Sequence, residues 1–338
     1  MASSIRIAID AMGGDFGPHP VICAAQKIVS LHPNAEIFVV GHQDQLTPLL
    51  EKFKLTDSTQ MHLVHAPDIV SMDDKPSTVL RQKQQSSMWK ALELVKMNQV
   101  DACVSCGNTG ALMAIGRYLL KTFPGIDRPA ICKAIPSRKG HCYLLDLGAN
   151  INCTAEQLAQ FASMGSVLAR VSDDNLSPSI GLLNIGEENI KGVEQVRLAS
   201  DMLTNNKMLN YAGFVEGNAI YTGNVDVIVC DGFVGNIALK VSEGAATFLL
   251  ESILDRFQSS LFGRLSGWFA SPVLKQWREK YNPDRHNGAC FLGLQGTVIK
   301  SHGSANDQGF YHALETAIDH VNKKVPEKIN EQLEDMFP

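Results

Sequence analysis

The chain has 338 residues, of which 45% are hydrophobic, 7% aromatic and 19% charged, and these values exclude a disordered tail, a collagen-like fibre and a small disulfide-stapled protein. With 30 Lys and Arg residues against 35 Asp and Glu residues, the net charge is −5. Nucleic-acid binding is not expected, because a phosphate backbone requires a basic surface.

The cysteines and the first residues indicate the compartment. Most of the eight Cys lie in apolar stretches such as DACVSC and VIVCDG, where a free thiol packs like a small hydrophobic side chain. We therefore expect a reduced, cytosolic protein. The first ten residues run directly into a predicted strand, and no run of about 18 or more apolar residues follows, so neither secretion nor a membrane span is expected.

Short β-branched runs ending in Gly or Asp alternate with segments of helical period, which is typical of βα units around a mostly parallel sheet. The first clear helix starts at Pro18, and another spans 154–171. We expect an α/β protein with one domain over 1–338, or two coupled subdomains. The predicted strands are 5–10, 36–41, 61–66, 102–105, 130–135, 143–147, 180–184 and 225–230.

The first predicted strand ends in Asp10-Ala-Met-Gly13-Gly14-Asp15. Two glycines and two carboxylates thus follow the carboxyl end of a strand, where open α/β sheets bind ligands. A tight turn with capping carboxylates is the simpler alternative. The motif is not G-x-G-x-x-G, so it does not predict a Rossmann dinucleotide site.

Arg81 and Lys83 lie two residues apart in a predicted helix. Residues at i and i+2 do not share a helix face. The two cations therefore either contact different parts of one large ligand or are ordinary surface charges.

Gly107, Asn108 and Thr109 connect a strand to a helix, where free backbone N–H groups and the helix dipole suit an anion. Cys103 and Cys106 form a C-x-x-C just before them. Without a second such pair or nearby His residues, buried packing explains these cysteines better than a metal site.

Three later motifs also place polar residues after predicted strands. Lys191 follows strand 180–184 in NIGEENIKG, and we expect it at the same sheet edge, where an ammonium can hold phosphate or an oxyanion; the alternative is a solvated lysine. Asp231 and Asn236 open a long helix in DGFVGN, and Asp231 is equally consistent with a helix cap. His302 ends a late strand in IKSHGS, but the G-x-S-x-G elbow of a Ser/His/Asp hydrolase is absent.

Residues 247–281 differ in composition from the rest of the chain. A predicted helix, FLLESILDRF, leads into SSLFGRLSGWFASPVL and then into a second amphipathic piece, KQWREKY. Two of the three Trp lie here, and the stretch from Arg256 to Arg285 has six basic and two acidic residues. We expect a protruding amphipathic helical segment.

Taken together, the motifs resemble the bacterial acyl-carrier-protein:phosphate acyltransferases of phospholipid synthesis, in order from about residue 5 to 321. The resemblance implies a three-layer α/β/α fold like that of phosphotransacetylase and the isocitrate and isopropylmalate dehydrogenases, a homodimer and peripheral membrane association. Cys106 stands where a small residue is expected. The matching stretches are IAIDAMGGDFGP, RQKQQSSM, GNTGALM, LLNIGEENIKG, GFVEGNAI, VDVIVCDGFVGNIALK and FLGLQGTVIKSHGS.

The resemblance implies that a fatty acyl thioester on the acidic acyl carrier protein and inorganic phosphate yield acyl phosphate, without a metal or cofactor. A membrane glycerol-3-phosphate acyltransferase then consumes the product. Lys191, His302 and Asn236 are the expected catalytic residues, with Lys191 and the helix start at Gly107 to Thr109 holding phosphate. Phosphate or substrate binding is expected of Asp10, Gly13, Gly14, Asp15, Arg81, Lys83, Gly107, Asn108, Thr109 and Asp231.

The resemblance also implies a cytoplasmic protein at the inner face of the membrane. The 247–281 segment would contact the membrane or the carrier protein, with a dimer contact as the alternative. The expected contact residues are Leu261, Phe262, Arg264, Leu265, Trp268, Phe269, Lys275 and Arg278.

Three other functions stay open. Coenzyme A thioesters could replace carrier-protein thioesters. A metal- and NAD-dependent oxidoreductase of the same fold would need a carboxylate cluster, of which only Asp226 and Asp231 are present. A non-catalytic membrane scaffold would need the protruding segment but not the polar strand-end motifs.

Overall fold

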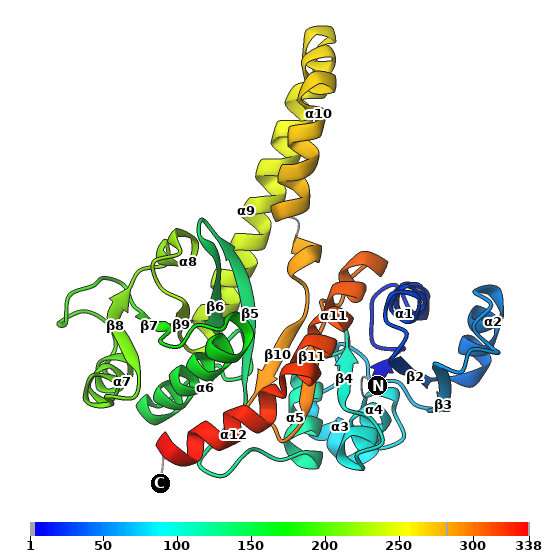
Figure 1. The fold of residues 1–338 in the computed structure, drawn as a ribbon, viewed down its shortest axis with the longest axis horizontal. Helices are drawn as coiled ribbons and strands as arrows, with labels where there is room; N and C mark the ends of the chain where they lie inside the picture. The colour runs from blue at the N-terminus through cyan, green and yellow to red at the C-terminus, as the bar shows by residue number, and fades with distance from the viewer. Residues whose placement is uncertain (1–3, 282, 337–338) are drawn as a thin grey trace.

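One sheet runs through the molecule (Figure 1). The computed structural model describes residues 4–281 and 283–336, apart from the side chains of 261, 263, 276–281, 283 and 334–336. Within these residues, eleven strands are ordered β3-β2-β1-β4-β11-β10-β5-β6-β9-β7-β8. The strands are β1 (Ile5–Asp10), β2 (Ala35–Gly41), β3 (Met61–His65), β4 (Ala102–Ser105), β5 (Ala130–Ser137), β6 (Gly140–Leu145), β7 (Ser179–Leu183), β8 (Asn210–Val215), β9 (Val227–Val229), β10 (Ala289–Leu292) and β11 (Thr297–Lys300).

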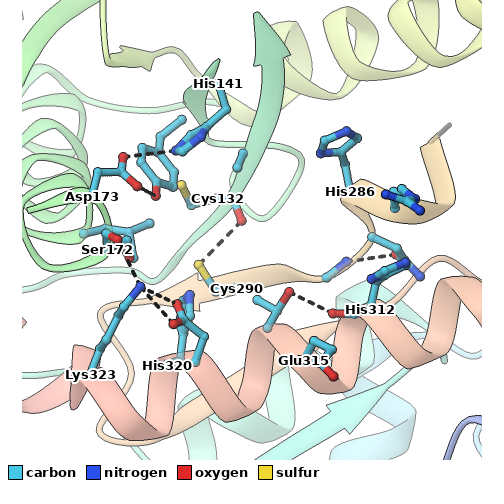
Figure 2. A pocket seen from close by; sticks show the side chains of 18 residues that line it. Cys132, His141, Ser172, Asp173, His286, Cys290, His312, Glu315, His320 and Lys323 are labelled. Atoms are coloured by element: carbon cyan, nitrogen blue, oxygen red, sulfur yellow. Dashed lines mark hydrogen bonds and ion pairs between the residues drawn. The ribbon is translucent and has the colours of Figure 1, made fainter. Parts of the chain in front are cut away.

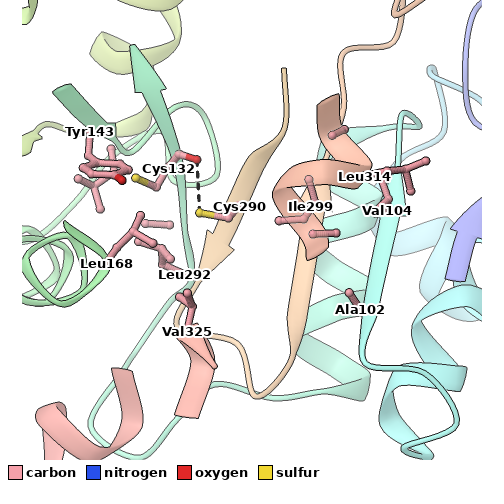
Figure 3. Packing of buried hydrophobic residues seen from close by; sticks show 14 of the residues in the cluster. Ala102, Val104, Cys132, Tyr143, Leu168, Cys290, Leu292, Ile299, Leu314 and Val325 are labelled. Carbon is pink, nitrogen blue, oxygen red and sulfur yellow. Dashed lines mark hydrogen bonds between the residues drawn. The ribbon is translucent and has the colours of Figure 1, made fainter. Parts of the chain in front are cut away.

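Helices cover both faces of this sheet. Side chains alternate between the faces of a strand, and in β1 Ile7 and Ile9 enter one hydrophobic core while Ala8 enters another. Figure 3 shows part of the first core, with Leu168 and Leu314 from helices of that side. The predicted three-layer α/β/α fold is therefore confirmed. The helices are α1 (Pro18–Leu31), α2 (Gln43–Lys52), α3 (Pro76–Gln82), α4 (Ser87–Lys96), α5 (Thr109–Leu119), α6 (Ala155–Asp173), α7 (Glu194–Asn205), α8 (Ala219–Thr222), α9 (Gly232–Gln258), α10 (Leu261–Tyr281), α11 (Asp307–Lys323) and α12 (Val325–Met336), with a short 3-10 helix, η1 (Pro283–His286).

The two halves of the sheet run in opposite directions. Most neighbouring strands are parallel, as predicted, but β5 pairs antiparallel with both β6 and β10, and β10 pairs antiparallel with β11. Strands β1, β4, β5 and β11 therefore point one way, whereas β6, β7 and β9 point the other way. The end of β7, which precedes Lys191, therefore lies at the opposite edge from the ends of β1 and β4, and the expectation that Lys191 shares their edge is wrong.

Local signals explain most element boundaries. Pro18 starts α1, and a capping box of Thr154 and Gln157 starts α6. Strands β1 and β4 have the predicted bounds. The sequence pattern does not predict β10, nor β8, which contains Gly213 with a φ of 99° beside a register shift in β7.

Residues 247–281, which we call the helical arm, project away from the sheet as the outer part of α9 and all of α10 (Figure 1). The two helices pack closely, because a Cβ on Gly267 would lie 3.1 Å from Phe257. The second half of the arm is one helix, since α10 continues through Pro272. None of the described helices is both long and apolar enough to cross a bilayer.

Candidate active site

A cavity of about 330 Å³ lies where α9 crosses the central strands β5, β10 and β11. Three lysines from three different elements line it, Lys133 of β5, Lys240 of α9 and Lys300 of β11, and we call it the lysine cavity. Asp15 and Glu243 supply the carboxylates of the described lining. The lysines outnumber these carboxylates, so the cavity suits a small anion.

Lys300 is the most deeply buried of these cations. Sheet register places it beside Ser105, which in turn lies beside Asp10. Its ammonium lies 3.4 Å from the Cys106 carbonyl oxygen and also contacts the Ser301 carbonyl. Burial lowers the pKa of Lys300 to about 8, because a low-dielectric site disfavours its charge. An anion in the cavity would restore that charge.

His302 follows Lys300 by two residues and lines the same cavity. Its Nε2 atom lies 2.8 Å from Lys240 Nζ, and its Nδ1 atom lies 2.7 Å from Ser304 Oγ. Because an ammonium only donates, Nε2 accepts from Lys240, and Nδ1 also accepts from the Ser304 N–H at 3.3 Å. Burial and the neighbouring Lys240 lower the pKa of His302, which favours the neutral form.

Helix α9 presents a polar stripe to the cavity at Asn236, Lys240 and Glu243, the i, i+4 and i+7 positions of one face. Glu243 accepts from Lys240 at 2.9 Å and from Lys133 at 3.2 Å. Burial alone would raise the pKa of Glu243, but the two lysines lower it further, so the carboxylate stays charged. It holds both lysines over the cavity mouth.

Asp10 lies next to the cavity and positions one of its loops. It is buried and accepts from Ser87 Oγ at 2.6 Å and from Ser105 Oγ at 2.7 Å. Burial raises its pKa, against the effect of these hydrogen bonds. A Cβ on Gly13 would lie 2.7 Å from both the Asp10 carboxylate and the Gly107 nitrogen, so the first loop packs directly on the β4–α5 loop. Asp10 and Gly13 thus position the loop rather than line the cavity.

The loops after β1, β4 and β11 interlock at the cavity rim. Asp15 N–H donates to the Gly303 carbonyl at 2.9 Å, and a Cβ on Gly14 would lie 2.9 Å from Cys106 Sγ. Gly107 and Thr109 line the cavity at the start of α5. Cys106 is buried, and burial raises its thiol pKa to about 12, so it packs as predicted and is not reactive.

The side chain of Asn108 forms its hydrogen bonds within the protein. Its Oδ1 atom caps α5 by accepting from Ala111 N–H at 3.0 Å, and its Nδ2 atom donates to the carbonyls of Ser71, Met72 and Asp74. Met72 lines the lysine cavity. The predicted ligand-binding amide is therefore engaged in holding a loop at the cavity rim.

The two cations of the R-x-K motif, Arg81 and Lys83, are also not among the described residues that line the cavity. Lys83 donates to the Ile69 carbonyl at 2.8 Å and pairs with Asp74, whose pKa it lowers. It thus ties down the loop that carries Met72. Arg81 is exposed on α3.

Two predicted residues of the second half lie elsewhere. Lys191 pairs with Glu188 at 2.8 Å in the loop after β7 and is not among the described residues that line the cavity. Asp231 caps α9 by accepting from Val234 N–H at 2.8 Å, which confirms the cap alternative. Asn236, five residues later, does reach the cavity.

Sequence reasoning missed Lys133, Lys240, Glu243 and Lys300 as site residues. Two signals could have found them: Lys133 interrupts an otherwise apolar strand, and Lys240 and Glu243 follow Asn236 at helical spacing. Lys300 stands in the strand-end motif that identified His302.

A second cavity, of about 430 Å³, lies on the other face of the same strands (Figure 2). It is lined by Cys132 and Cys290, whereas their neighbours Lys133 and Ala289 line the lysine cavity, and adjacent strand residues face opposite sides. Asn287 lines both cavities. We call the second one the histidine cavity, after His141, His286, His312 and His320 in its lining.

Comparison with known proteins gives consistent findings. A sequence model of the family described as "Fatty acid synthesis protein" matches residues 5–328. The phosphate acyltransferase of Cellvibrio japonicus is 50% identical over 334 residues, covering 98% of this chain and 99% of its own. That of Nitrosococcus oceani is 51% identical over 331 residues, covering 98% and 97%.

Solved structures share the fold at low identity. A phosphotransacetylase from Streptococcus pyogenes superposes with a TM-score of 0.61 at 18% identity, covering 95% of this chain and 94% of that chain. A branched-chain phosphotransacylase from Enterococcus faecalis gives 0.58 at 15% identity, covering 94% and 99%. These structures support the α/β architecture.

Proposed function

The chain belongs to the phosphate acyltransferase family, and from this we propose that it transfers a fatty acyl group from the thioester of acyl carrier protein to inorganic phosphate. The acyltransferase activity makes acyl phosphate for phospholipid synthesis. The carrier protein as donor, the residues of the site and the partners named below are our proposals.

The lysine cavity carries this proposal. Lys133, Lys240 and Lys300 converge there beside a neutral His302, and the start of α5 adds its dipole at Gly107. Three ammonium groups in a partly buried hollow stabilise a dianion such as phosphate more strongly than they would in water. We assign the phosphate-holding role expected of Lys191 to Lys300 instead.

The reaction needs no protein nucleophile. An oxygen of HPO₄²⁻ attacks the thioester carbonyl carbon, the tetrahedral intermediate collapses, and the carbon–sulfur bond breaks to give acyl phosphate and, once the sulfur takes up the phosphate proton, a free thiol. Phosphate draws Lys240 away from His302, whose Nε2 accepts the phosphate proton and passes it to the departing sulfur. Asn236 and Lys300 stabilise the oxyanion from opposite walls.

The test is release of free thiol from long-chain acyl carrier protein with and without phosphate, with hydroxylamine trapping the acyl phosphate. We expect thiol release only with phosphate, together with acyl hydroxamate. Phosphate-independent release, or none with either the carrier protein or acyl coenzyme A, would remove the proposal. Release from acyl coenzyme A alone would keep the reaction and replace the donor.

We further propose that the helical arm contacts an anionic membrane and the acidic carrier protein at the inner face of the membrane. Phe262, Trp268 and Phe269 are 81%, 71% and 70% exposed at the outer end of the arm, and Arg264 and Lys275 add positive charge nearby. Leu265 is also exposed, whereas the side chains of Leu261 and Arg278 lie outside the described residues. A membrane glycerol-3-phosphate acyltransferase would there receive the product.

The membrane proposal is tested by replacing Phe262, Trp268 and Phe269 with Ser and measuring flotation with anionic liposomes. Binding should be lost while thiol release in solution persists. The matched control replaces Leu176, Ile185 and Ile190, which are equally exposed but lie away from the arm. Unchanged flotation of the arm variant would remove the proposal.

A homodimer is proposed through a second face of α9, next to the cavity face. Val234, Ile237 and Val241 recur there at helical spacing and are all exposed. Replacement of Ile237 and Val241 by Glu should yield a monomer in light scattering. A dimer that survives this change would place the interface elsewhere.

A further inference from the structure

The lysine cavity continues into a second hollow along α9. This hollow, the α9 groove, has a volume of about 490 Å³ and shares five lining residues with the cavity, His302 and Lys240 among them. Beyond the shared residues, Gly244, Thr247, Phe248 and Glu251 of α9 form one wall. A molecule bound in the groove would therefore have one end at His302.

The part of the groove beyond the cavity has mixed chemistry. Hydroxyls of Thr247 and Ser304, carboxylates of Glu251 and Asp284 and the ring of Phe248 face the same space. A bare hydrocarbon chain would remove these polar groups from water without replacing their hydrogen bonds, which costs free energy. A flexible chain that carries amides and hydroxyls pairs with them and packs its methylenes on the ring.

The charges give the groove a direction. Lys133, Lys240 and Lys300 gather at the cavity end, whereas Glu251 and Asp284 lie at the far part. Phosphate is thus favoured at the cavity end and disfavoured along the groove. The groove therefore suits a neutral chain.

We propose that the α9 groove binds the amide-bearing thiol arm of the acyl donor, the arm that carrier proteins and coenzyme A have in common. This rests on the function proposed above. The thioester carbon then lies at the junction of groove and cavity, where His302 lines both. The sulfur points into the groove and leaves along it when the carbon–sulfur bond breaks, with the proton supplied through His302.

Gly244 offers a selective way to block the groove. It lines the groove but not the lysine cavity, and a Cβ added there meets nothing within 4 Å. A side chain at this helical position would project into the groove without displacing a neighbour. Gly217, in the loop before α8, is equally open and serves as the control.

The experiment compares wild type, Gly244→Ala, Gly244→Phe and Gly217→Phe with two donors of the same acyl chain, a pantetheine thioester and a thioester of a simple alkyl thiol. Gly244→Phe should raise the pantetheine-donor KM about tenfold or more, with Ala intermediate. The phosphate KM and activity with the alkyl-thiol donor should not change. Gly217→Phe should match wild type with both donors.

An unchanged pantetheine-donor KM in Gly244→Phe would overturn the proposal. Equal losses with both donors would also overturn it, as would rescue of Gly244→Phe by shortening the acyl chain, which would place the acyl chain in the groove. Failure of the proposed function is distinguishable, because it would abolish phosphate-dependent thiol release in the wild-type protein itself. Circular dichroism confirms that each variant is folded.

Discussion

The lysine and histidine cavities lie back to back on β5 and β10, and both contain several titratable side chains, yet their charges are arranged differently. In the histidine cavity most charges are paired within the protein: His141 with Asp173 (Figure 2), Lys323 with Asp319, and Glu315 with His32 outside the cavity. In the lysine cavity, Lys133 and Lys240 share a single carboxylate, Glu243, whereas Lys300 contacts only backbone carbonyls among the contacts described and a neutral imidazole lies beside Lys240.

The number of ionisable groups in a hollow therefore does not identify a binding site. The histidine cavity is the larger of the two and contains more of them, but its ion pairs leave little net charge for a ligand. An anion requires a surplus of positive charge in the hollow, with the cations held in place by a partner such as Glu243. Matched substitutions in the two cavities therefore test this difference.

The largest effect is expected from His302→Gln. Loss of the group that moves the phosphate proton should lower kcat by about 10²–10⁴-fold, the usual range for general acid–base catalysis. His312→Gln, the same change in the histidine cavity, should leave kcat near the wild-type value. Equal losses of kcat in both variants would show that the lysine cavity is no more important for catalysis than the histidine cavity. Stopped assays of thiol release measure both.

Lys300→Met should follow in size. The methionine fills the same buried space without the charge, so kcat/KM for phosphate should fall about 10²–10³-fold, as for other lost oxyanion partners. Lys323→Met is the control in the histidine cavity and should retain kcat/KM. A Lys300→Met enzyme with normal kcat/KM would assign the anion to other residues.

His320, in the histidine cavity, should affect stability rather than turnover. Burial lowers its pKa to about 4, whereas an unfolded chain has a His pKa of about 6.5. Between these pH values the unfolded state binds more protons than the folded state. The contribution of neutral His320 to the free energy of unfolding is therefore nearly complete above pH 6.5 and falls as the pH drops. From pH 7.5 to pH 5 this costs about 2 kcal/mol. Urea unfolding of wild type and His320→Leu should differ in that slope; parallel slopes would contradict it.

The smallest effect concerns pH and phosphate affinity. Since the pKa of Lys300 is about 8, the ammonium loses its proton as the pH rises through that value. The phosphate KM should rise above pH 8, approaching about tenfold per further pH unit. Lys300→Arg keeps its charge and should lack this rise. A flat wild-type profile between pH 7 and 9.5 would mean that Lys300 does not hold the phosphate.

Much of the fold follows from sequence pattern. The βα alternation, the strand at Ile5–Asp10 and the helix start at Pro18 are local signals, and each is found in the structure. The reversal of direction between β5 and β6 is not local, because hairpin and crossover depend on which strand the chain pairs with next. The sequence pattern therefore does not predict the direction of β6, β7 and β9 relative to β1.

The sequence predicts only those site residues that directly follow a strand. Asp15, Gly107 and His302 follow β1, β4 and β11, and the structure brings them to one rim. Lys133 and Lys240 come from the middle of a strand and of a helix, where a lysine is usually solvated, and only tertiary packing directs both into one hollow. Their contribution depends on distances that no sequence spacing encodes.

The most direct test of the lysine cavity is calorimetric titration of the wild-type, Lys300→Met and Lys323→Met proteins with inorganic phosphate. The account predicts that wild type and Lys323→Met bind phosphate with the same Kd and that Lys300→Met binds at least about tenfold more weakly. If Lys323→Met loses binding and Lys300→Met keeps it, phosphate belongs to the histidine cavity and the account is contradicted.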